Sequence, residues 1–420
     1  MLGHDLARQH LQLTRRYFLG LGAAGAAALA SSRSFAGATE GGDPLRAAAA
    51  ALQDKYLTPD AKFGTVERGN PLPYTLPPDK LREAGLVRET WQLEVFADPD
   101  SNSQIERPLS KAQGTALDFD GLMKLAEKHA VRILKLMTCN NGNSPLGMGL
   151  WEGVPLREVI WLTGPKENIR HVSYYGHHNE DPKQMFQCWL PVNRVLEDPP
   201  EGLPVLLCYK LNGEWLSGKR GGPVRMLVPE SYGFKSVKWI QRVLLTNNHQ
   251  SNDTYADGNN DTNNSWLKTL ARFADIEIKG RAGQPIAITG IAQVGISGLA
   301  KVQYWLQPKD GPLPPDDPYL ATAPWQGADI LPPPDRWPNL PDGKLPDGMV
   351  QFDPLTGRPR QWPLRYTIAH WAVLAPALAP GKYDVRCRTI DVAGHAQPLP
   401  RPFAKSGRNT IQRVTLNVEA

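Results

Sequence analysis

Residues 131–156, VRILKLMTCNNGNSPLGMGLWEGVPL, place a cysteine between an apolar run and a tryptophan-containing motif. The run 131–137 has the composition of a short buried strand. It leads to TCNNGN at 138–143, whose glycine and asparagines tolerate unusual backbone angles and therefore indicate a loop. The sequence thus predicts that Cys139 lies in a loop at the end of a buried strand.

The residues before this segment predict a strand and a helix. WQLEV at 91–95 alternates apolar and polar side chains with the period of a half-buried strand. Residues 118–130 form the clearest helical pattern, with Asp118 as a suitable N-cap. The side chains that recur there at helical spacing are Leu122, Leu125, Ala126 and His129. Residues 41–78 are punctuated by prolines and predict an extended segment.

A second dense pattern follows the cysteine loop. Residues 204–209 and 224–228 read as strands that flank a turn at Asn212-Gly213, which is one of the stronger short-range hairpin signals. Between residues 211 and 239 the chain carries LNGE, GGPVR, VP, YG and SVKW in that order. An ordered series of this kind is far more specific than one short motif.

From about residue 275 the pattern changes to short β runs at regular spacing, which predicts a small antiparallel sandwich of immunoglobulin type. The runs lie at 275–279, 286–292, 300–307, 370–373, 383–391 and 410–417. Residues 308–362 form a proline-crowded insert that is longer than ordinary hairpin loops. We expect this insert either to pack on the surface through Trp325 and Trp337 or to stay mobile.

The cysteine loop, the WEGVPL motif at 151–156 and the block at 211–239 together resemble the sulfite oxidase family of molybdenum enzymes. Leu190-Pro191 and several residues of the last third are also similar to that family, so the resemblance covers nearly the whole chain after residue 36. It implies an α+β protein. A mixed α/β molybdopterin-binding catalytic domain would occupy residues 37–272, and an all-β immunoglobulin-like dimerisation domain would occupy residues 273–420.

The resemblance also implies a molybdenum–molybdopterin cofactor. Cys139 would bind the metal, because a soft thiolate suits molybdenum held among sulfur ligands; a buried structural cysteine is the alternative. Arg225 and Lys238 would supply charge-assisted donors to the pterin phosphate, and solvated surface charges are the alternative. The pterin-binding residues implied by the resemblance are Arg68, Asn70, Cys139, Arg225, Ser236, Val237 and Lys238.

The residues expected beside the substrate depart from the family. Sulfite oxidases usually follow the cysteine with arginines, whereas residues 140–145 here read NNGNSP. We therefore expect an oxyanion to be held from outside this loop by His177 and His178, which could also pass protons. Ordinary exposed loop histidines are the alternative, with Arg68 or Arg170 then binding the anion. Tyr255 resembles the family's active-site tyrosine, although a surface tyrosine is equally expected.

Composition excludes several other classes of protein. The four cysteines form no CxxC or CxxCH motif, so we expect no disulfide framework, zinc site, iron–sulfur cluster or attached haem. Cys188, Cys208 and Cys387 are then buried free thiols by default. The 39 prolines and 38 glycines indicate a mostly β or irregular architecture. Without a haem motif, electrons would leave to an external c-type cytochrome.

The first 36 residues have the pattern of a twin-arginine export signal. TRRYFLG at 14–20 carries the arginine pair, an Ala/Gly-rich apolar stretch follows, and SFA at 34–36 is a small-x-small cleavage site. The apolar stretch is shorter than the ~20 residues of a membrane-spanning helix. We expect a folded, periplasmic protein with no membrane segment in its mature form. Removing this leader lowers the formal charge from +5 to +2, which argues against nucleic-acid binding.

These observations favour an exported molybdenum oxidoreductase that transfers an oxygen atom on a small sulfur substrate. Oxidation of the oxyanion sulfite to sulfate is the leading prediction, with a homodimer formed through the sandwich. A reductase of methionine sulfoxide or another oxide is the alternative: the missing arginines favour it and the C-terminal sandwich opposes it. A non-enzymatic binding protein is a third hypothesis, and it leaves the leader and the 211–239 block unexplained.

Overall fold

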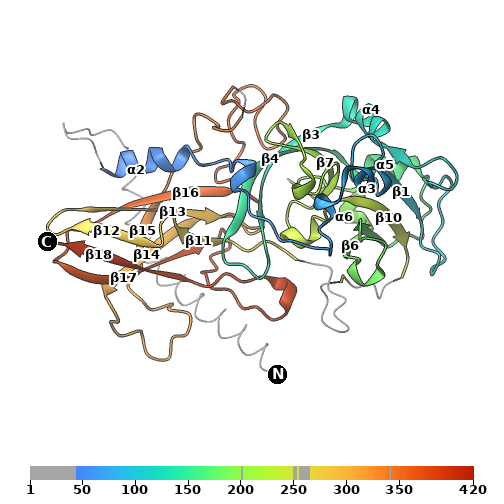
Figure 1. The fold of residues 1–420 in the computed structure, drawn as a ribbon. Coiled ribbons are helices and arrows are strands. Elements are labelled where there is room, and N and C mark those ends of the chain that lie inside the picture. The colour runs from blue at the N-terminus through green and yellow to red at the C-terminus, as the bar shows by residue number, and fades with distance from the viewer. Residues whose placement is uncertain (1–43, 200–201, 249–252, 255–264, 341) are drawn as a thin grey trace.

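The computed structural model describes residues 44–199, 202–248, 253–254, 265–340 and 342–420. These residues form three β-sheets, two in the first part of the chain and one in the last part (Figure 1). The predicted leader at 1–36 and Tyr255 lie outside the described residues. Among the described helices, none combines the length and the apolar composition needed to span a membrane.

The first sheet has the order β2-β1-β10-β5-β6, and only β1 and β10 run parallel within it. Its strands are β1 (Gln92–Ala97), β2 (Leu117–Asp118), β5 (His171–Gly176), β6 (Gln187–Pro191) and β10 (Ile240–Thr246). The second sheet has the order β3-β4-β7-β8, with β9 also paired to β7. Its strands are β3 (Val131–Thr138), β4 (Pro145–Pro155), β7 (Leu206–Leu211), β8 (Glu214–Trp215) and β9 (Arg225–Leu227).

Short helices and single 3-10 turns connect these strands. The helices are α3 (Pro78–Glu83), α4 (Phe119–His129), α5 (Leu156–Leu162) and α6 (Val192–Leu196). The 3-10 turns are η1 (Asp60–Lys62), η2 (Pro73–Thr75), η3 (Pro182–Gln184), η4 (Gly218–Arg220) and η5 (Gly233–Lys235). Asp118 caps α4 as predicted, because its carboxylate accepts a hydrogen bond from Gly121 N at 2.7 Å. Such a cap stabilises a helix by about 1 kcal/mol.

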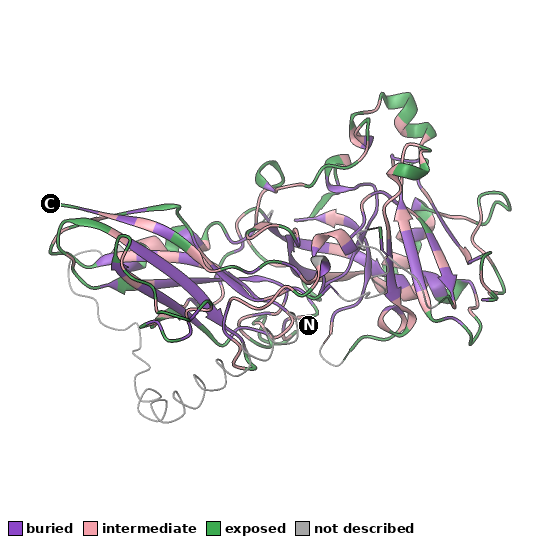
Figure 2. Ribbon diagram, turned by 90° about the horizontal axis from the view of Figure 1, so that it is seen from below, coloured by how far each residue is buried: buried purple, intermediate pink, exposed green. Residues whose placement is uncertain are grey.

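The main core lies against the first sheet, and buried strands run through the body of the molecule (Figure 2). Leu93 and Val95 of β1 pack there with Tyr174 of β5 and Val243 of β10. Glu94, predicted to face solvent, is also buried, because its carboxylate pairs with Arg242 at 3.0 Å. The strand at 91–95 is confirmed, but both of its faces are covered.

Gly153 of the WEGVPL motif is needed for strand pairing. Its neighbour across the sheet is Cys208 of β7, at a point where the register shifts. A Cβ atom at this position would overlap the main chain of Leu207 and Cys208. The glycine therefore allows β4 and β7 to approach closely, which a larger residue would prevent.

The C-terminal part is a β-sandwich built from one eight-stranded sheet of order β11-β13-β16-β15-β14-β17-β18-β12. Its strands are β11 (Leu270–Phe273), β12 (Glu277–Arg281), β13 (Ile286–Gln293), β14 (Lys301–Pro308), β15 (Gln326–Ile330), β16 (Ile368–Ala375), β17 (Gly381–Ile390) and β18 (Gln412–Glu419). All six predicted runs are strands, and β11 and β15 were not predicted. The domain division at residues 272 and 273 stays a prediction, since β11 already begins at Leu270.

The prediction of an extended segment at 41–78 is wrong for helix α2 (Pro44–Gln53). This helix lies along the sandwich beside β13 and β16 (Figure 1). Leu45 packs there against Leu331 and Ala372. The helix contains a run of five alanines, the residue with the highest helix propensity, and this outweighs the prolines around it.

The proline-crowded insert at 308–362 packs against the rest of the protein. Trp337 is buried and meets the ring of Tyr56 edge-on at 5.0 Å. Gln351 accepts a hydrogen bond from Leu134 N at 2.8 Å and donates one to Leu134 O at 3.2 Å, so the insert contacts the strand that leads to Cys139. Trp325 is held differently, beneath the guanidinium of Arg388 at 4.3 Å.

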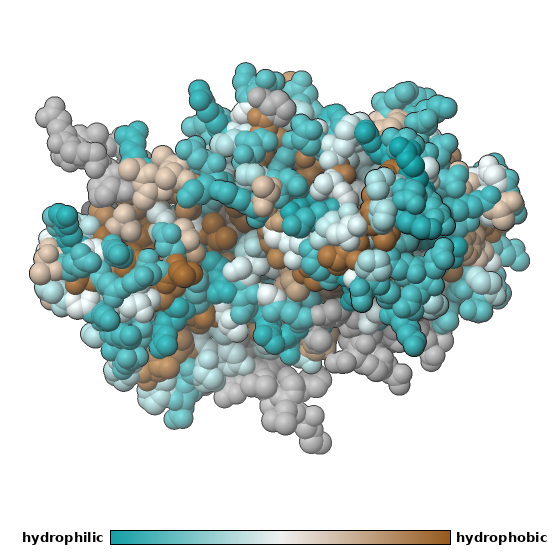
Figure 3. All heavy atoms as spheres, viewed as in Figure 1, coloured by the Kyte–Doolittle hydropathy of each residue, from teal (hydrophilic) through white to brown (hydrophobic). Residues whose placement is uncertain are grey.

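The chain is therefore α+β, with mixed sheets and short helices followed by a β-sandwich. The face drawn in Figure 3 is covered mainly by hydrophilic residues, with hydrophobic ones scattered among them. Loops that connect strands of different sheets meet at one cavity, and this cavity is the candidate functional site.

Candidate active site

A cavity opens where the end of β3 meets the segment 63–69, the loop after β5 and the 211–239 block. Eight of the predicted site residues line it: Arg68, Cys139, His177, His178, Arg225, Ser236, Val237 and Lys238. Asn70 lies beside this wall, since its N–H donates to the side chain of Gln184, a lining residue, at 2.8 Å. The fold brings these residues together, and their individual roles stay predictions.

Cys139 is the most accessible of the four thiols. It is half-buried at the end of β3, and the turn that follows is closed by a hydrogen bond from Gly142 N to Cys139 O at 3.0 Å. Cys188, Cys208 and Cys387 are buried as predicted, and burial raises the pKa of each of these three thiols. Only Cys139 therefore combines access to the cavity with a thiol group.

Arg225 is a buried cation whose hydrogen-bond acceptors, within the part of the chain that the structure describes, are uncharged. Its side chain donates to the main-chain carbonyls of Arg220 at 2.8 Å and Ser236 at 2.6 Å. Its Nε is buried and has no hydrogen-bond partner among the described residues. Burial lowers the pKa of Arg225 to about 10. This position rules out a solvated surface charge, and a negative group in the cavity would compensate the guanidinium.

Lys238 repeats this pattern on the same wall. Its ammonium group donates to Thr65 Oγ1 at 2.6 Å and to Val66 O at 3.3 Å, and neither acceptor carries a charge. Burial, and then the neighbouring Arg225, lower the pKa of Lys238 to about 7. Gly221, with φ of 95°, lies against Lys238 where a Cβ would overlap the lysine side chain. The glycine thus leaves the room that Lys238 occupies.

The rest of the lining is largely apolar. Phe63, Leu146, Phe186 and Phe234 line the cavity together with the cations. The guanidinium of Arg68 lies 4.0 Å from the centre of the Phe186 ring, a cation–π contact that fixes the arginine at the cavity wall. A cavity of this kind suits a planar organic group that carries negative charge at one end.

His177 and His178 lie at the cavity but are partly desolvated. His177 N donates to Trp239 O at 3.0 Å, and its ring Nε2 accepts from Asn179 N at 3.2 Å. Burial lowers the pKa of His177 and also that of His178, with Arg242 lowering His178 further. Both side chains are therefore more often neutral near pH 7 than an exposed histidine.

Three arginines that the sequence did not reveal meet the cysteine loop. Arg272 Nε donates to Asn143 O, Arg401 donates to Asn141 Oδ1 at 2.6 Å, and the main-chain N–H of Arg408 donates to Asn140 O at 3.0 Å. The loop itself has no arginine, and these come from the C-terminal part of the chain. No local signal could have found them, because each is more than 100 residues away from its partner.

A half-buried thiol, two desolvated cations and apolar side chains line one cavity, and this combination suits an anionic organic cofactor. Residues 88–254 match the family described as "Oxidoreductase molybdopterin binding domain". The chain is 33% identical to the protein-methionine-sulfoxide reductase catalytic subunit MsrP of Ralstonia nicotianae over 262 aligned residues. The alignment covers 57% of this chain and 70% of that protein.

Two further proteins are similar to this chain. The mitochondrial sulfite oxidase of Drosophila melanogaster is 26% identical over 197 residues, which cover 46% of this chain and 32% of that enzyme. The crystal structure of the sulfane dehydrogenase SoxCD from Paracoccus pantotrophus shares the fold, with a TM-score of 0.52 at 16% identity over 80% of this chain and 79% of that one. The chain thus spans about a third of the sulfite oxidase.

This chain belongs to the sulfite oxidase family of molybdopterin oxidoreductases. It is an enzyme whose cofactor is molybdenum–molybdopterin. The residues present fit that group, because Arg225 Nε, which has no hydrogen-bond partner among the described residues, and the ammonium group of Lys238, which donates to uncharged acceptors, line the same cavity as Cys139.

Proposed function

We propose that the enzyme oxidises the small sulfur oxyanion sulfite to sulfate and passes the electrons to a c-type cytochrome. Sulfite gains one oxygen atom from water, and two electrons and two protons are released. The bound molybdenum cofactor supplies the two-electron exchange and the oxygen transfer. The observation that supports an oxyanion is the presence of Arg68, His177 and His178 in the same cavity as Cys139.

The proposed roles of the chain's own residues follow from their positions. Cys139 holds the metal from the end of β3, and Arg225 with Lys238 holds the pterin phosphate in the same cavity. Ser236 and Val237 continue the cavity lining, and Asn70 supports it through Gln184. Protonated His177 and His178 attract the anion, and their neutral forms accept the protons that oxidation releases.

Reduction of a sulfoxide is the second candidate. Phe186 and Phe234 offer apolar contacts to a methyl or alkyl group on sulfur, which sulfite lacks. The 33% identity with the methionine sulfoxide reductase subunit supports the same candidate. A sulfoxide is neutral, so its binding would not require the charged side chains of the cavity.

The two candidates are separated by running the reaction in both directions with purified, metal-loaded protein. Sulfite with ferricytochrome c measures oxidation, and methionine sulfoxide with a reduced viologen dye measures reduction. We expect sulfite-dependent cytochrome reduction to have the higher kcat/KM. A higher kcat/KM for methionine sulfoxide would overturn the proposal in favour of the reductase.

Replacing both histidines by alanine should raise the KM for sulfite by about tenfold at a pH low enough to protonate both imidazoles, because two charge-assisted contacts are lost. Burial lowers both pKa values, so protonation is fully present only well below pH 6.5 and is lost as the pH rises through that lower window. An unperturbed histidine would instead titrate at about pH 6.5. The ratio of the KM of the double variant to that of the unsubstituted enzyme should fall toward one as the pH rises through this window, because both enzymes then lack protonated histidines. His129→Ala, on α4, is the matched control; equal KM values in all three proteins would refute the role.

We also propose export by the twin-arginine route. Replacing Arg15 and Arg16 by lysine should leave the precursor in the cytoplasm, because the pathway reads the arginine pair rather than the charge. Fractionation and immunoblotting measure the distribution, with Arg8→Lys as the control. Periplasmic accumulation of the double lysine variant would contradict the proposal.

A two-fold dimer through the C-terminal sandwich is the remaining proposal on assembly, because self-complementary contacts are the commonest route to symmetric oligomers. Light scattering at micromolar concentration should give about twice the mass of one chain. A mass equal to that of a single chain would exclude the dimer.

A further inference from the structure

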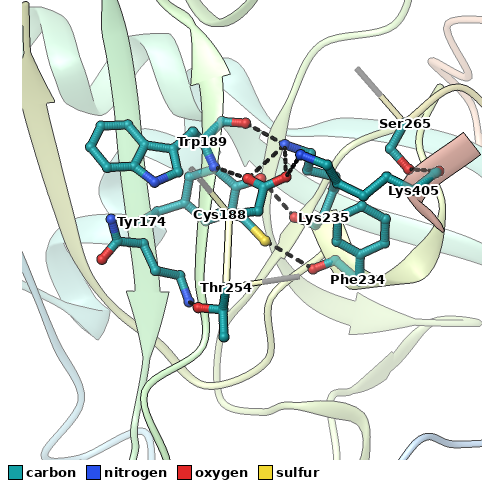
Figure 4. Close-up of polar contacts among 10 residues, drawn as sticks. Tyr174, Cys188, Trp189, Phe234, Lys235, Thr254, Ser265 and Lys405 are labelled. Atoms are coloured by element: carbon teal, nitrogen blue, oxygen red, sulfur yellow. Dashed lines mark hydrogen bonds and ion pairs between the residues drawn. The ribbon is translucent and has the colours of Figure 1, made fainter. Parts of the chain in front are cut away.

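A buried ionic cluster joins the C-terminal sandwich to the back of the cavity (Figure 4). The Asp253 carboxylate receives the ammonium groups of Lys235 at 2.9 Å and Lys405 at 3.2 Å, and all three side chains are inaccessible to solvent. Asp253 also accepts a hydrogen bond from Trp189 N at 2.9 Å, and Lys235 donates to Trp189 O at 2.6 Å. One carboxylate is thus shared by two cations.

Burying three charged side chains in a core has a high free-energy cost. Removing charges from water costs several kcal/mol per ion, and apolar side chains of similar volume often stabilise a fold as well or better. Lys405 is the second ammonium group on a carboxylate that already pairs with Lys235. For buried charged groups of this kind, directing a segment to one position is the best-attested role.

The three residues come from different parts of the chain. Lys235 ends η5, whose Gly233 and Phe234 line the cavity. Asp253 follows β10 in the sequence. Lys405 lies in η6 (Ala404–Ser406), within the connection between β17 and β18 of the sandwich. The cluster therefore fastens a sandwich connection to the wall of the active-site cavity.

The same connection contacts the cysteine loop on both sides of Lys405. Arg401 donates to Asn141 Oδ1 at 2.6 Å, and the N–H of Arg408 donates to Asn140 O at 3.0 Å. Lys268 closes the connection by donating to Pro400 O at 2.8 Å and Gly407 O at 3.1 Å. The segment 400–408 is thus attached to the core by the ion pair of Lys405, and it forms hydrogen bonds with the two residues directly after Cys139.

We propose that Lys405 is a positioning residue: its ammonium group, buried on Asp253, holds the segment 400–408 against the cysteine loop and so sets the place of the Cys139 thiolate. This assignment rests on the proposed role of Cys139 as metal ligand. It gives the sandwich a task in the active site of its own chain, separate from any part in dimerisation.

The test is hydrogen–deuterium exchange of the full-length chain, with and without cofactor, read on peptides that cover residues 137–146. Lys405→Met removes the charge and leaves Asp253 paired with Lys235. We expect exchange at residues 140–143 to become about tenfold faster or more, as the loss of a charge-assisted contact predicts. Lys382→Met removes an exposed lysine from β17 of the same sandwich and should change nothing.

A second variant keeps the test decisive if Lys405→Met fails to fold. Arg401→Gln breaks the side-chain contact to Asn141 at the far end of the segment and leaves the buried cluster intact. It should speed exchange in the same loop by a few-fold. Unchanged loop exchange in Arg401→Gln, or in a folded Lys405→Met, overturns the proposal.

Kinetics of the loaded enzyme provide a readout that simple destabilisation does not move. Lys405→Met should lower kcat while KM and the molybdenum content per chain stay at the values of Lys382→Met. Because exchange is also measured without cofactor, a failure of the Cys139 assignment leaves that measurement valid. An error about Cys139 would appear in the metal content of Cys139→Ser, and an error about Lys405 would appear in loop exchange.

Discussion

Cys139→Ser should reduce the turnover of the loaded enzyme by more than ~100-fold, since even the outer-shell partners of metal ligands contribute 10–100-fold. A serine hydroxyl is a harder donor that stays protonated near neutral pH, so it replaces a thiolate poorly at molybdenum. The fold should be unaffected, because Cys139 is half-buried in a loop and serine has nearly the same shape. We expect the free energy of unfolding to change by less than about 0.5 kcal/mol.

Cys387→Ser is the matched control for this substitution. Cys387 lies fully buried in β17 of the sandwich and does not line the cavity, so a serine there places a hydroxyl in an apolar core. That variant should lose about 1–3 kcal/mol of stability and keep its turnover per molybdenum atom. Turnover, metal analysis and thermal unfolding of both variants decide the matter. Full activity of Cys139→Ser with molybdenum bound would refute the role of the cysteine.

Lys238→Met should lower the affinity for the pterin cofactor by about 10- to 100-fold, because a charge-assisted contact with the phosphate is worth about 1.5–3 kcal/mol. The cofactor-free protein should respond in the opposite direction. Its Lys238 ammonium group is desolvated and has only uncharged acceptors, so replacing it with an apolar side chain of similar length should leave stability unchanged or raise it.

The pH dependence of the cofactor-free protein gives an independent check. Lys238 has a pKa of about 7 when folded and about 10.4 when unfolded, so between these values the unfolded chain binds the additional proton. Stability should therefore rise with pH across this window, and Lys238→Met should reduce the slope. Thermal unfolding and pterin content measure both effects. Lys301→Met, an exposed lysine in β14 of the sandwich, is the control; normal pterin content in Lys238→Met would exclude the phosphate contact.

The elements predicted correctly are those whose signal is local. Asp118 caps α4 because capping needs only the next turn of the same helix. The run 131–137 is a strand because its apolar side chains fill a core from both faces. The helix α2 was missed because prolines outweighed alanines in that prediction, and β15 was missed because its Gln-Gly-Ala-Asp-Ile sequence carries little strand propensity and depends on the neighbours β14 and β16.

The candidate site divides in the same way. The roles proposed for Cys139, Arg225 and Lys238 come from motifs, because thiolate ligation and phosphate binding require particular residue types at particular spacing. The environment of these groups could not be read. Burial decides that Arg225 has an unpartnered Nε, that Lys238 has a pKa near 7 and that the histidine transition falls below pH 6.5.

The sequence by itself determined the family, the α+β class, the cysteine loop and the cationic residues of the pterin block, since these depend on the order and spacing of residues along the chain. Only the tertiary structure decided what surrounds that loop. Arg401, Lys405 and Asp253 are separated from Cys139 by more than 100 residues and carry no motif. Their contacts arise from the packing of the sandwich on the first two sheets. Contacts between residues so far apart in the chain produce no motif or hydrophobic periodicity from which they could be predicted.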